Sequence, residues 1–407
     1  MGVVAPMDRR SLLLALGSAA LASGRSVARA AEPTDLRSFG ARGDGVSDDA
    51  SALARALASG APLDGGGRTY GVRGPLEAGG SFRSLRNCTL VQLEADDHLQ
   101  TLLIRGADSF ALADVTVVRG RQNDNVLVQR DMMRNAGIWI EDCIGFHLDR
   151  VQVSAGGIGT GLVVVQSSGF SMTDAKVTGI HYQLHARPTD DMLQGIWIQR
   201  STGFELTRPV VSDLGGQDDQ GFSRDNNRAI AISGSSNFKV TDIDVSQCGQ
   251  GLDVTGKEGN HDFEVTGGHA ADCFSWGFKF ANSAQRGRVT GALAERCGLG
   301  GFVVSGPSEI SDPPTQDIEI VDCRASDCGA QYSPHTTFGF GVLRGKADYV
   351  HPTRVRFLRC SAVDARSPPG MKWGYLNQIA EPESGRNVTE ACVSKGAAVA
   401  DYKGFQS

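Results

Sequence analysis

The chain lacks the features that would link it to a membrane interior, to nucleic acid or to zinc. After residue 31 no apolar run is long enough to cross a bilayer, so no membrane span is expected. The 40 basic and 46 acidic residues give a net charge of -6, which argues against nucleic acid as a main partner. No CxxC or His/Cys spacing typical of a zinc site occurs.

The first 31 residues have the pattern of an export signal. Paired arginines at 9–10 precede an apolar run over 12–22, and the small-x-small motif at 28–30 would direct cleavage. The paired arginines resemble a twin-arginine signal, with an ordinary Sec signal as the alternative. Translation could start at Met1 or Met7. We therefore expect a soluble mature protein that is periplasmic or secreted.

Nine cysteines in an exported protein first suggest disulfides. Four of them, however, close successive repeats in similar local settings: Cys248, Cys273, Cys297 and Cys328. This spacing predicts a buried ladder of reduced, inert thiols that pack as small apolar residues. Neighbouring strands about 4.8 Å apart would also permit a disulfide, but the odd cysteine count favours free thiols.

A glycine or alanine followed by a short apolar strand occurs seven times. These phrases begin at Gly137, Gly161, Gly195, Ala229, Gly251, Gly277 and Gly301. Their spacings are 24, 34, 34, 22, 26 and 24 residues, and units of this length must stack to bury a core. A recurring phenylalanine is expected to stack inside: Phe110, Phe146, Phe170, Phe204, Phe238 and Phe263. About three short strands per unit, with no intervening helices, predict a parallel β-helix.

The segment before the repeats resembles a known superfamily. Residues 39–49 read Phe-Gly-Ala-Arg-Gly-Asp-Gly-Val-Ser-Asp-Asp, a helix is expected over 50–57, and residues 66–72 read Gly-Gly-Arg-Thr-Tyr-Gly-Val. This pattern resembles the N-terminal signature of the pectate-lyase-like superfamily, in the branch of polygalacturonases, rhamnogalacturonases, some epimerases and phage tailspikes. The resemblance implies an all-β fold, a single-stranded right-handed parallel β-helix with a short N-terminal capping helix. It also implies a polysaccharide or oligosaccharide substrate.

The chain is expected to divide into four stretches: a signal (1–31), a cap with the first strands (32–80), the coils (81–369) and a tail (370–407). In the cap, Ser47 is expected to be the helix N-cap. Asp44, Asp48 and Asp49 are expected to shape a turn and the helix start rather than a catalytic pair. The tail is expected to cover the open end of the last coil.

Three long interruptions of the coil pattern are expected to meet at one corner: 121–136, 181–194 and 215–228. Alternation along the adjoining strand predicts an outward row of Trp139, Val163, Trp197, Ala231, Asp253, Lys279 and Val303. The two tryptophans would either stack against sugar rings or be covered by the inserts. Asp253 and Lys279 would be either site residues or a simple ion pair.

The inserts and the outward row supply the candidate site residues. The catalytic candidates are titratable: Asp190, Asp191, Asp218, Asp219, Asp253, His181, His185 and Lys279. The substrate-binding candidates are aromatic or basic: Trp139, Trp197, Tyr182, Arg130, Arg134, Arg187 and Arg224. No cofactor is expected, although the acidic inserts could hold Ca²⁺ through oxygen ligands without any diagnostic spacing.

Three functions fit these candidates. Hydrolysis needs two carboxylates across the bond, and residues 217–219 and 250–253 resemble polygalacturonase motifs, although Gln250 replaces an aspartate there and the Gly-His-Gly motif is absent. A lyase or epimerase would neutralise a uronate carboxylate and use His, Tyr or Lys as acid or base. The third interpretation is a non-catalytic polysaccharide-binding or envelope-structural β-helix. Hydrolysis is favoured because carboxylates outnumber candidate bases in the inserts.

Overall fold

A computed structural model describes most of the chain. The described residues are 32–93, 100–119, 135–154, 159–182, 193–216, 227–307, 311–329, 337–345, 351–379 and 387–405. The chain separates into two units, Met1–Glu32 and Pro33–Ser407, and the account below concerns the second. The predicted export signal over 1–31 lies outside the described residues. No helix in the described ranges has both the length and the apolar character needed to cross a membrane.

The first elements cover the start of the coils. They are β1 (Thr34–Asp35), the 3-10 helix η1 (Leu36–Phe39), β2 (Asp44–Asp48) and α1 (Ala50–Ala58). Helix α1 buries one apolar stripe in the main core: Ala52, Leu53, Ala56 and Leu57. This confirms the predicted capping helix.

The three aspartates of the cap have structural roles, as predicted, but Ser47 does not cap the helix. Asp49 is the N-cap residue, and its carboxylate accepts backbone hydrogen bonds from Arg42 (2.7 Å) and Gly43 (3.0 Å). The Ser47 hydroxyl instead donates to Asp44 (2.7 Å). The chain is still extended at Ser47, because β2 continues to Asp48, so the helix starts later than a Ser47 cap would allow.

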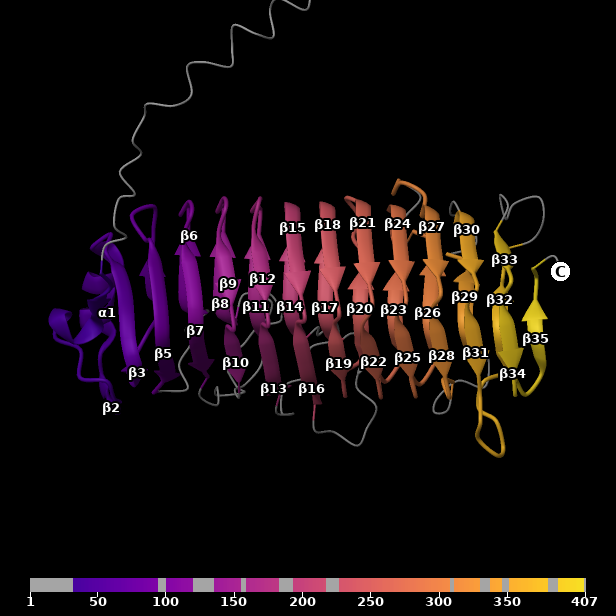
Figure 1. The fold of residues 1–407 in the computed structure, drawn as a ribbon, viewed down its shortest axis with the longest axis horizontal. Helices are drawn as coiled ribbons and strands as arrows, with labels where there is room; N and C mark the ends of the chain where they lie inside the picture. The colour runs from indigo at the N-terminus through magenta and orange to yellow at the C-terminus, as the bar shows by residue number, and fades with distance from the viewer. Residues whose placement is uncertain are drawn as a thin grey trace, which may run out of the picture. The chain divides into compact units, whose positions relative to one another are not determined.

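One sheet, here sheet B, contains one strand from each coil. Its strands in spatial order are β4 (Leu76–Ala78), β6 (Gln100–Arg105), β8 (Ala136–Glu141), β11 (Thr160–Val165), β14 (Gln194–Gln199), β17 (Arg228–Ser233), β20 (Gln250–Val254), β23 (Trp276–Phe280), β26 (Gly300–Ser305), β29 (Phe338–Leu343), β32 (Trp373–Asn377) and β35 (Ala400–Lys403). Every pairing recorded in it is parallel, and Figure 1 shows the strands of successive coils side by side in chain order.

The second sheet, here sheet A, has two arms. It begins with β1, β2 and three long strands that run through both arms, β3 (Pro62–Val72), β5 (Ser84–Gln92) and β7 (Ala111–Val118). The first arm continues through β9 (His147–Asp149), β12 (Ser171–Thr173), β15 (Thr202–Thr207), β18 (Ser236–Thr241), β21 (Asn260–Thr266), β24 (Ala284–Thr290), β27 (Gln316–Val321), β30 (Thr353–Leu358) and β33 (Val388–Glu390). The second continues through β10 (Gln152–Ser154), β13 (Lys176–Tyr182), β16 (Val210–Gly216), β19 (Asp244–Ser246), β22 (His269–Ala271), β25 (Leu293–Glu295), β28 (Arg324–Ser326), β31 (Ser361–Val363) and β34 (Val393–Lys395).

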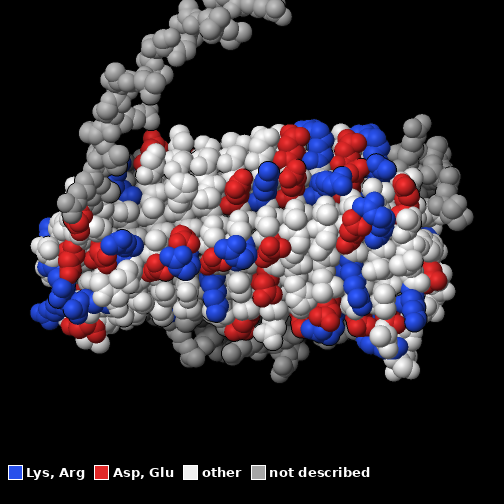
Figure 2. Space-filling view, in the orientation of Figure 1, with Lys and Arg blue, Asp and Glu red and all other residues white. Residues whose placement is uncertain are grey.

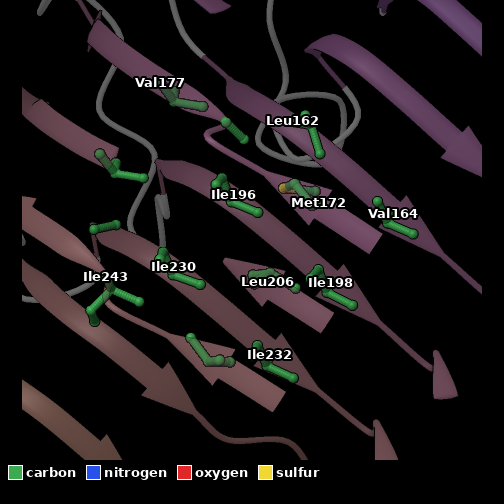
Figure 3. Close-up of a cluster of buried hydrophobic side chains, with 14 of the residues drawn as sticks. Leu162, Val164, Met172, Val177, Ile196, Ile198, Leu206, Ile230, Ile232 and Ile243 are labelled. Atoms are coloured by element: carbon green, nitrogen blue, oxygen red, sulfur yellow. The ribbon is translucent and has the colours of Figure 1, made fainter. Parts of the chain in front are cut away.

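The core lies between the sheets and is built from identical registers on successive coils. In Figure 3 the inward pairs Leu162/Val164, Ile196/Ile198 and Ile230/Ile232 of sheet B face side chains of sheet A such as Met172 and Leu206. These side chains have at most a trace of exposed surface. The rung-over-rung stacking predicted from the glycine-led phrases is therefore confirmed.

The predicted phenylalanine ladder is also confirmed. The rings from Phe110 to Phe263 stack nearly parallel, with centroids 4.7 to 5.3 Å apart. The next coil has Gly287 at this register, and Phe263 stacks instead on Phe280, 5.8 Å away. A second column on sheet B continues the stacking, through Phe278, Phe302, Phe340, Tyr375 and Tyr402.

All nine cysteines are free, and eight of them are buried. The predicted ladder is present: the sulfurs of Cys248 and Cys273 lie 3.6 Å apart. In the next two coils Cys297 and Cys328 are also buried, and their thiols donate to the backbone carbonyls of Ala270 and Ala294. The prediction of reduced, buried thiols agrees with this arrangement.

Charged residues occupy equivalent turn positions on several successive coils. At the bend between the arms of sheet A the left-handed residues are Asp114, Arg150, Asp174, Arg208 and Asp242, with φ of 50 to 53°. Oppositely charged neighbours pair across coils, with Arg150 Nε 2.6 Å from Asp114 and Arg208 Nη2 2.8 Å from Asp174. Figure 2 shows acidic and basic side chains alternating in rows along this face.

The tail differs from its prediction. Instead of covering the last coil, the described part of the tail, 370–379 and 387–405, adds strands β32, β33, β34 and β35, which pair in parallel with β29, β30, β31 and β32. The reason is that Trp373-Gly-Tyr-Leu repeats the glycine-led phrase, and its Tyr375 is fully buried in the aromatic column.

Candidate functional site

The long interruptions leave and re-enter the coils at matched positions. Before the second and third breaks, Tyr182 pairs with Gly216, and after them Gln194 pairs with Arg228. The first break follows β7, which pairs with β10, and ends at β8, which pairs with β11. All three therefore start on the second arm of sheet A and end on sheet B, which agrees with the prediction of a single flank.

The strands of sheet B hold the predicted outward row in register. We call it the central row: Trp139, Val163, Trp197, Ala231, Asp253, Lys279 and Val303. In most of these strands a glycine stands two residues before the central-row residue. A Cβ at Gly195 would lie 2.4 Å from a methyl group of Val211, so glycine lets the strand backbone come close to the second arm of sheet A. This close packing fixes which side chains face outward.

Trp139 and Trp197 are covered rather than open. Each is 8% exposed, and their rings meet edge to face with centroids 6.4 Å apart at 87°. They form a small apolar cluster with Leu103, Ala136, Val163, Val165 and Ala231. Of the two alternatives for these rings, the structure supports burial, because indoles leaning over small apolar neighbours remove much area from water. An open two-tryptophan platform is not formed.

Asp253 and Lys279 form part of a three-membered ionic cluster. Asp253 has no exposed side-chain surface, and its Oδ2 lies 2.6 Å from Arg228 Nε and 3.6 Å from Lys279 Nζ. Lys279 also donates to Gln250 Oε1 (3.3 Å). The predicted simple ion pair therefore exists, with Arg228 as an additional partner. In the structure this buried carboxylate therefore holds the two cations in place, and its predicted catalytic role stays a prediction.

A second row, polar at four of its six positions, runs beside the central row. We call it the upstream row, because each member precedes a central residue by three positions: Ala136, Thr160, Gln194, Arg228, Gln250 and Trp276. Thr160 and Gln194 are at most 1% exposed, and among the described residues Thr160 Oγ1 and Gln194 Oε1 have no hydrogen-bond partner. Buried polar atoms are almost always satisfied, so these two neighbouring atoms have hydrogen-bonding capacity left for a ligand or for water.

The rows border a pocket of about 270 Å³. Its lining includes Gln194, Trp197 and Arg228 from the two rows. The opposite wall comes from the ends of β14 and β17 and from the turn between β20 and β21, with Arg200, Gly234 and Glu258 among its residues. The pocket therefore lies where a buried acceptor, an indole and a guanidinium meet.

Most of the predicted insert residues cannot be placed. These lie outside the described residues: Arg130, Arg134, His185, Arg187, Asp190, Asp191, Asp218, Asp219 and Arg224. His181 and Tyr182 end β13, where only their backbone is described. Within the described ranges no group of three His, Cys, Asp or Glu side chains is placed to hold a metal ion. The Ca²⁺ prediction concerned the inserts and stays a prediction.

The upstream row was missed at the sequence level. The sequence prediction covered the outward residues two positions after each glycine, and it did not cover the residue immediately before the glycine. That position reads Thr160, Gln194, Arg228 and Gln250 on four successive coils, a polar run in strands that are otherwise apolar. Reading it as a column would have revealed the partner of Asp253.

Comparison with known proteins bears on the fold. No family model matches the chain, and no curated protein sequence matches it. Among solved structures, the A-module of a mannuronan C-5 epimerase from Azotobacter vinelandii matches with a TM-score of 0.62 and 14% identity, covering 91% of this chain and 98% of the module. The tailspike of the E. coli bacteriophage HK620, in complex with a pentasaccharide, matches with a TM-score of 0.59, 10% identity and 92% of this chain.

The catalytic domain of a GH87 α-1,3-glucanase, in complex with nigerose, matches with a TM-score of 0.56, 10% identity and 87% of this chain. This chain spans 64% of the tailspike and 64% of the glucanase domain. At such identities the likeness concerns the fold alone. The chain is a right-handed parallel β-helix.

Proposed function

We propose that this chain is an enzyme that acts on a polysaccharide bound along the outward face of β11, β14, β17, β20 and β23. The observation that carries the proposal is the buried polar cluster there, in which Asp253 faces two cations beside unsatisfied acceptors of Thr160 and Gln194. Apolar side chains would stabilise this face at least as well. The cluster therefore supports a ligand-binding role rather than a folding role.

The charges of the cluster favour an acidic polysaccharide. Arg228 and Lys279 both reach toward Asp253, so this face presents a guanidinium and an ammonium group to a ligand. A uronate carboxylate is the sugar group that such cations bind, and its neutralisation is what β-elimination or epimerisation at C5 requires before a base removes the C5 proton. Asp253 would hold both cations in place. A lyase or epimerase is therefore the reaction class that the described residues support best.

Hydrolysis by a carboxylate pair is the second candidate. Asp253 is already bonded to Arg228 and Lys279, so the carboxylate pair proposed here comes from Asp190, Asp191, Asp218 and Asp219. One observation favours this: the two segments that carry them leave and re-enter the coils at paired residues, Tyr182 with Gly216 and Gln194 with Arg228. Segments anchored side by side could present carboxylates to one bond.

A panel of uronate and neutral polysaccharides tests the proposal. Elimination gives an unsaturated product seen by ultraviolet absorbance, whereas hydrolysis gives reducing ends without that absorbance. We expect product from a uronate polymer, and a loss of at least about 100-fold in kcat/KM, about 2.7 kcal/mol, for Lys279→Met. Arg105→Met is the matched control, because it breaks the exposed Arg105–Glu141 pair on the same sheet, away from the cluster.

The outcomes separate the interpretations. Binding to a polysaccharide without any product would support the non-catalytic interpretation. Proton exchange at C5 without chain cleavage would identify an epimerase. Neither binding nor product across the panel would contradict the proposal. The sugars in the glucanase and tailspike structures support a carbohydrate as ligand class, and the arginine-led N-terminal pattern supports a periplasmic or secreted location.

A further inference from the structure

We propose that a second copy of this chain binds face to face on the exposed side of the first arm of sheet A, with the two coil stacks antiparallel. The surface comprises the outward side chains of β21, β24, β27 and β30, and we call it the striped face. It belongs to sheet A, whereas the candidate site lies on sheet B, so the inference stands apart from the proposed function. Eight charged residues make up the striped face: Asp262, Glu264, Arg286, Arg288, Asp317, Glu319, Arg354 and Arg356.

Each strand of the striped face carries two charges of one sign, and the sign alternates from coil to coil. β21 and β27 each have two carboxylates, and β24 and β30 each have two guanidinium groups. Figure 2 shows this alternation over these strands, at the upper right. Neighbouring strands pair within the chain, with Arg286 Nε 2.6 Å from Asp262 Oδ1 and Arg288 Nη1 2.6 Å from Glu319 Oε2. The eight charges cancel, so the face has a pattern of charge but no net charge.

The paired side chains keep capacity for further contacts. Asp262 and Arg286 are 41% and 50% exposed, and Arg288 and Arg356 are 53% and 44% exposed. A guanidinium has five N–H donors and a carboxylate about four lone-pair positions, so a two-point contact uses only part of either group. A groove of about 560 Å³, lined by the charged side chains of β21 and β24 among others, gives long side chains of a partner space to enter. The face can therefore bind a second charged surface without breaking its own pairs.

Of the two face-to-face arrangements with twofold symmetry, only one brings unlike charges together. An axis parallel to the coil stack would place each strand against its own copy, so like charges would meet and repel. An axis along the strands, midway between β24 and β27, reverses the stack of the second copy. β24 then faces β27 of the second copy, and β21 faces β30. Every strand of the striped face meets charges of opposite sign, because an even number of alternating stripes is complementary to its own reverse.

The same axis brings equivalent side chains opposite each other. It leaves the strand direction unchanged, so Arg286 faces Asp317 of the second copy. The row at the bend between the arms of sheet A gives a contrast, because its five members also alternate in charge. Reversing an odd row places its middle residue, Asp174, against its own copy. Alternation alone is thus not enough, and the striped face has the even count that self-pairing needs.

The area of the face predicts a weak dimer. Overlap centred between β24 and β27 extends over six strands, from β18 to β33. At about 4.8 Å per strand and about 3.3 Å per residue over six residues, the overlap spans roughly 29 by 20 Å, or roughly 600 Å² per copy. Standard interfaces bury about 800 Å² per partner, and smaller ones are typically weak and reversible. We therefore expect a dissociation constant of about 100 μM at low salt.

Sedimentation equilibrium of the full chain tests the dimer, with protein from about 10 to 500 μM, a range that brackets the expected dissociation constant. We expect a monomer–dimer equilibrium at about 0.02 M salt that weakens at least tenfold at about 0.5 M, because added ions screen exposed charges. A chain that stays monomeric over this range at low salt would overturn the inference. A dimer whose affinity does not change with salt would overturn it as well.

Two charge-reversed variants test the geometry. Arg286→Glu with Arg288→Glu makes β24 acidic, and Asp317→Arg with Glu319→Arg makes β27 basic. Each variant alone should be monomeric, because β24 and β27 of two copies would then carry like charges. An equimolar mixture should dimerise, because the acidic β24 of one variant meets the basic β27 of the other. Both variants keep a negative net charge, since the natural chain has -6 and each change shifts it by four, so bulk attraction cannot produce the mixed dimer.

The matched control is Arg150→Glu with Arg208→Glu, which makes the same change of charge in the bend row and also breaks exposed ion pairs. It should dimerise like the natural chain. The milder variant Arg286→Gln with Arg288→Gln removes attraction without adding repulsion and should weaken the dimer about tenfold or more. Equal loss of the dimer in the control, or no mixed dimer from two reversed variants that circular dichroism shows to be folded, would overturn the inference. Neither result depends on a polysaccharide, so the dimer and the proposed function are tested separately.

Discussion

Asp253 is the most informative single residue, because its burial between two cations leads to a testable prediction about stability. We expect Asp253→Asn to lower the free energy of unfolding by about 3 kcal/mol, since it leaves Arg228 and Lys279 close together without their buried anion. Denaturant titration followed by circular dichroism measures the change. From the sequence, this substitution would be expected to affect turnover much more than stability, and the burial of Asp253 changes that expectation.

The matched control at this scale is Asp174→Asn. Asp174 also bonds an arginine, Arg208, at 2.8 Å, but its side chain is 38% exposed. Exposed pairs contribute little, so a loss below about 1 kcal/mol is expected. Equal losses in the two variants would mean that burial of Asp253 does not matter, and the positioning role would fail.

Residue by residue, the sequence predicted positions better than surroundings. The outward placement of Trp139, Trp197 and Asp253 follows from alternation along a strand, and the structure confirms it. Their burial does not follow, because it depends on how long side chains lean across neighbouring coils. Arg228 was assigned to an insert, although it is the first residue of β17, since its partner Asp253 is distant in the sequence and adjacent only in space.

Among the elements, the change of aromatic column at Gly287 offers a test of packing. The ring of Phe263 occupies the space of the missing side chain, and a Cβ at Gly287 would lie 2.0 Å from its Cζ. Gly287→Ala should therefore destabilise the protein by about 1 to 3 kcal/mol through overpacking. Chemical denaturation measures it. Gly79→Ala is the control, because a Cβ there meets nothing within 4 Å.

The charged turn rows predict how stability depends on pH. Hydrogen bonds from arginine partners lower the pKa of Asp114, Asp174, Asp272 and Asp322 below the ordinary value of 3.8. In the unfolded chain these groups bind protons more readily, so their contribution is complete above about pH 4 and is lost as pH falls through the folded values. We expect the melting temperature to be flat from pH 7 to 5 and to fall below pH 4.

Melting curves between pH 7 and pH 2 check this profile. Replacing Asp174 and Arg208 together by Asn and Gln should make the fall shallower, because one depressed carboxyl is removed. A melting temperature that already drops between pH 7 and 5 would contradict the explanation, since carboxyls with lowered pKa values do not titrate there.

At the level of elements the period of the sequence was a strong guide and the turns were not. Glycine-led phrases and recurring phenylalanines predicted the strands of both sheets, because a residue that repeats once per coil stacks on the equivalent residue of the neighbouring coil. The alternating Asp and Arg turns looked like ordinary loop charge. Their meaning depends on left-handed backbone at Asp174 and Arg208, which local sequence does not reveal for these residue types.

For the whole molecule, stacking explains both the success of the fold prediction and the gap in the site. Each coil contacts its neighbours through identical registers, so a wrong prediction for one strand does not affect the others. The tail was expected to be a cap, and its phrase Trp373-Gly-Tyr-Leu is the signal that would have identified it as further coils. The sequences of the inserts do not repeat from coil to coil. Their residues could be named from composition, but the way they meet depends on contacts that no repeat encodes.

The reactivity of the cysteines tests whether the stacked coils stay closed together. Eight of nine thiols are buried, and Cys392, in the last coil, is partly exposed. Burial raises the pKa of Cys88 to about 12, so its reactive thiolate is scarce near neutral pH. Because each ladder is sealed by neighbouring coils, the intact fold should protect the buried thiols together. We therefore expect Ellman's reagent at pH 8 to modify no more than one thiol per native chain within minutes.

In denaturant the same reagent should modify all nine thiols, because none is held in a disulfide. The Cys392→Ser variant is the control: any single fast reaction of the native chain should disappear with it, while the slow ones stay unchanged. Several fast thiols in the native protein would mean that coils open locally and that the stack is less cooperative than a continuous core implies. A shortfall of two in denaturant would instead reveal a disulfide, with Cys248 and Cys273 as the first pair to examine, since their sulfurs are already 3.6 Å apart.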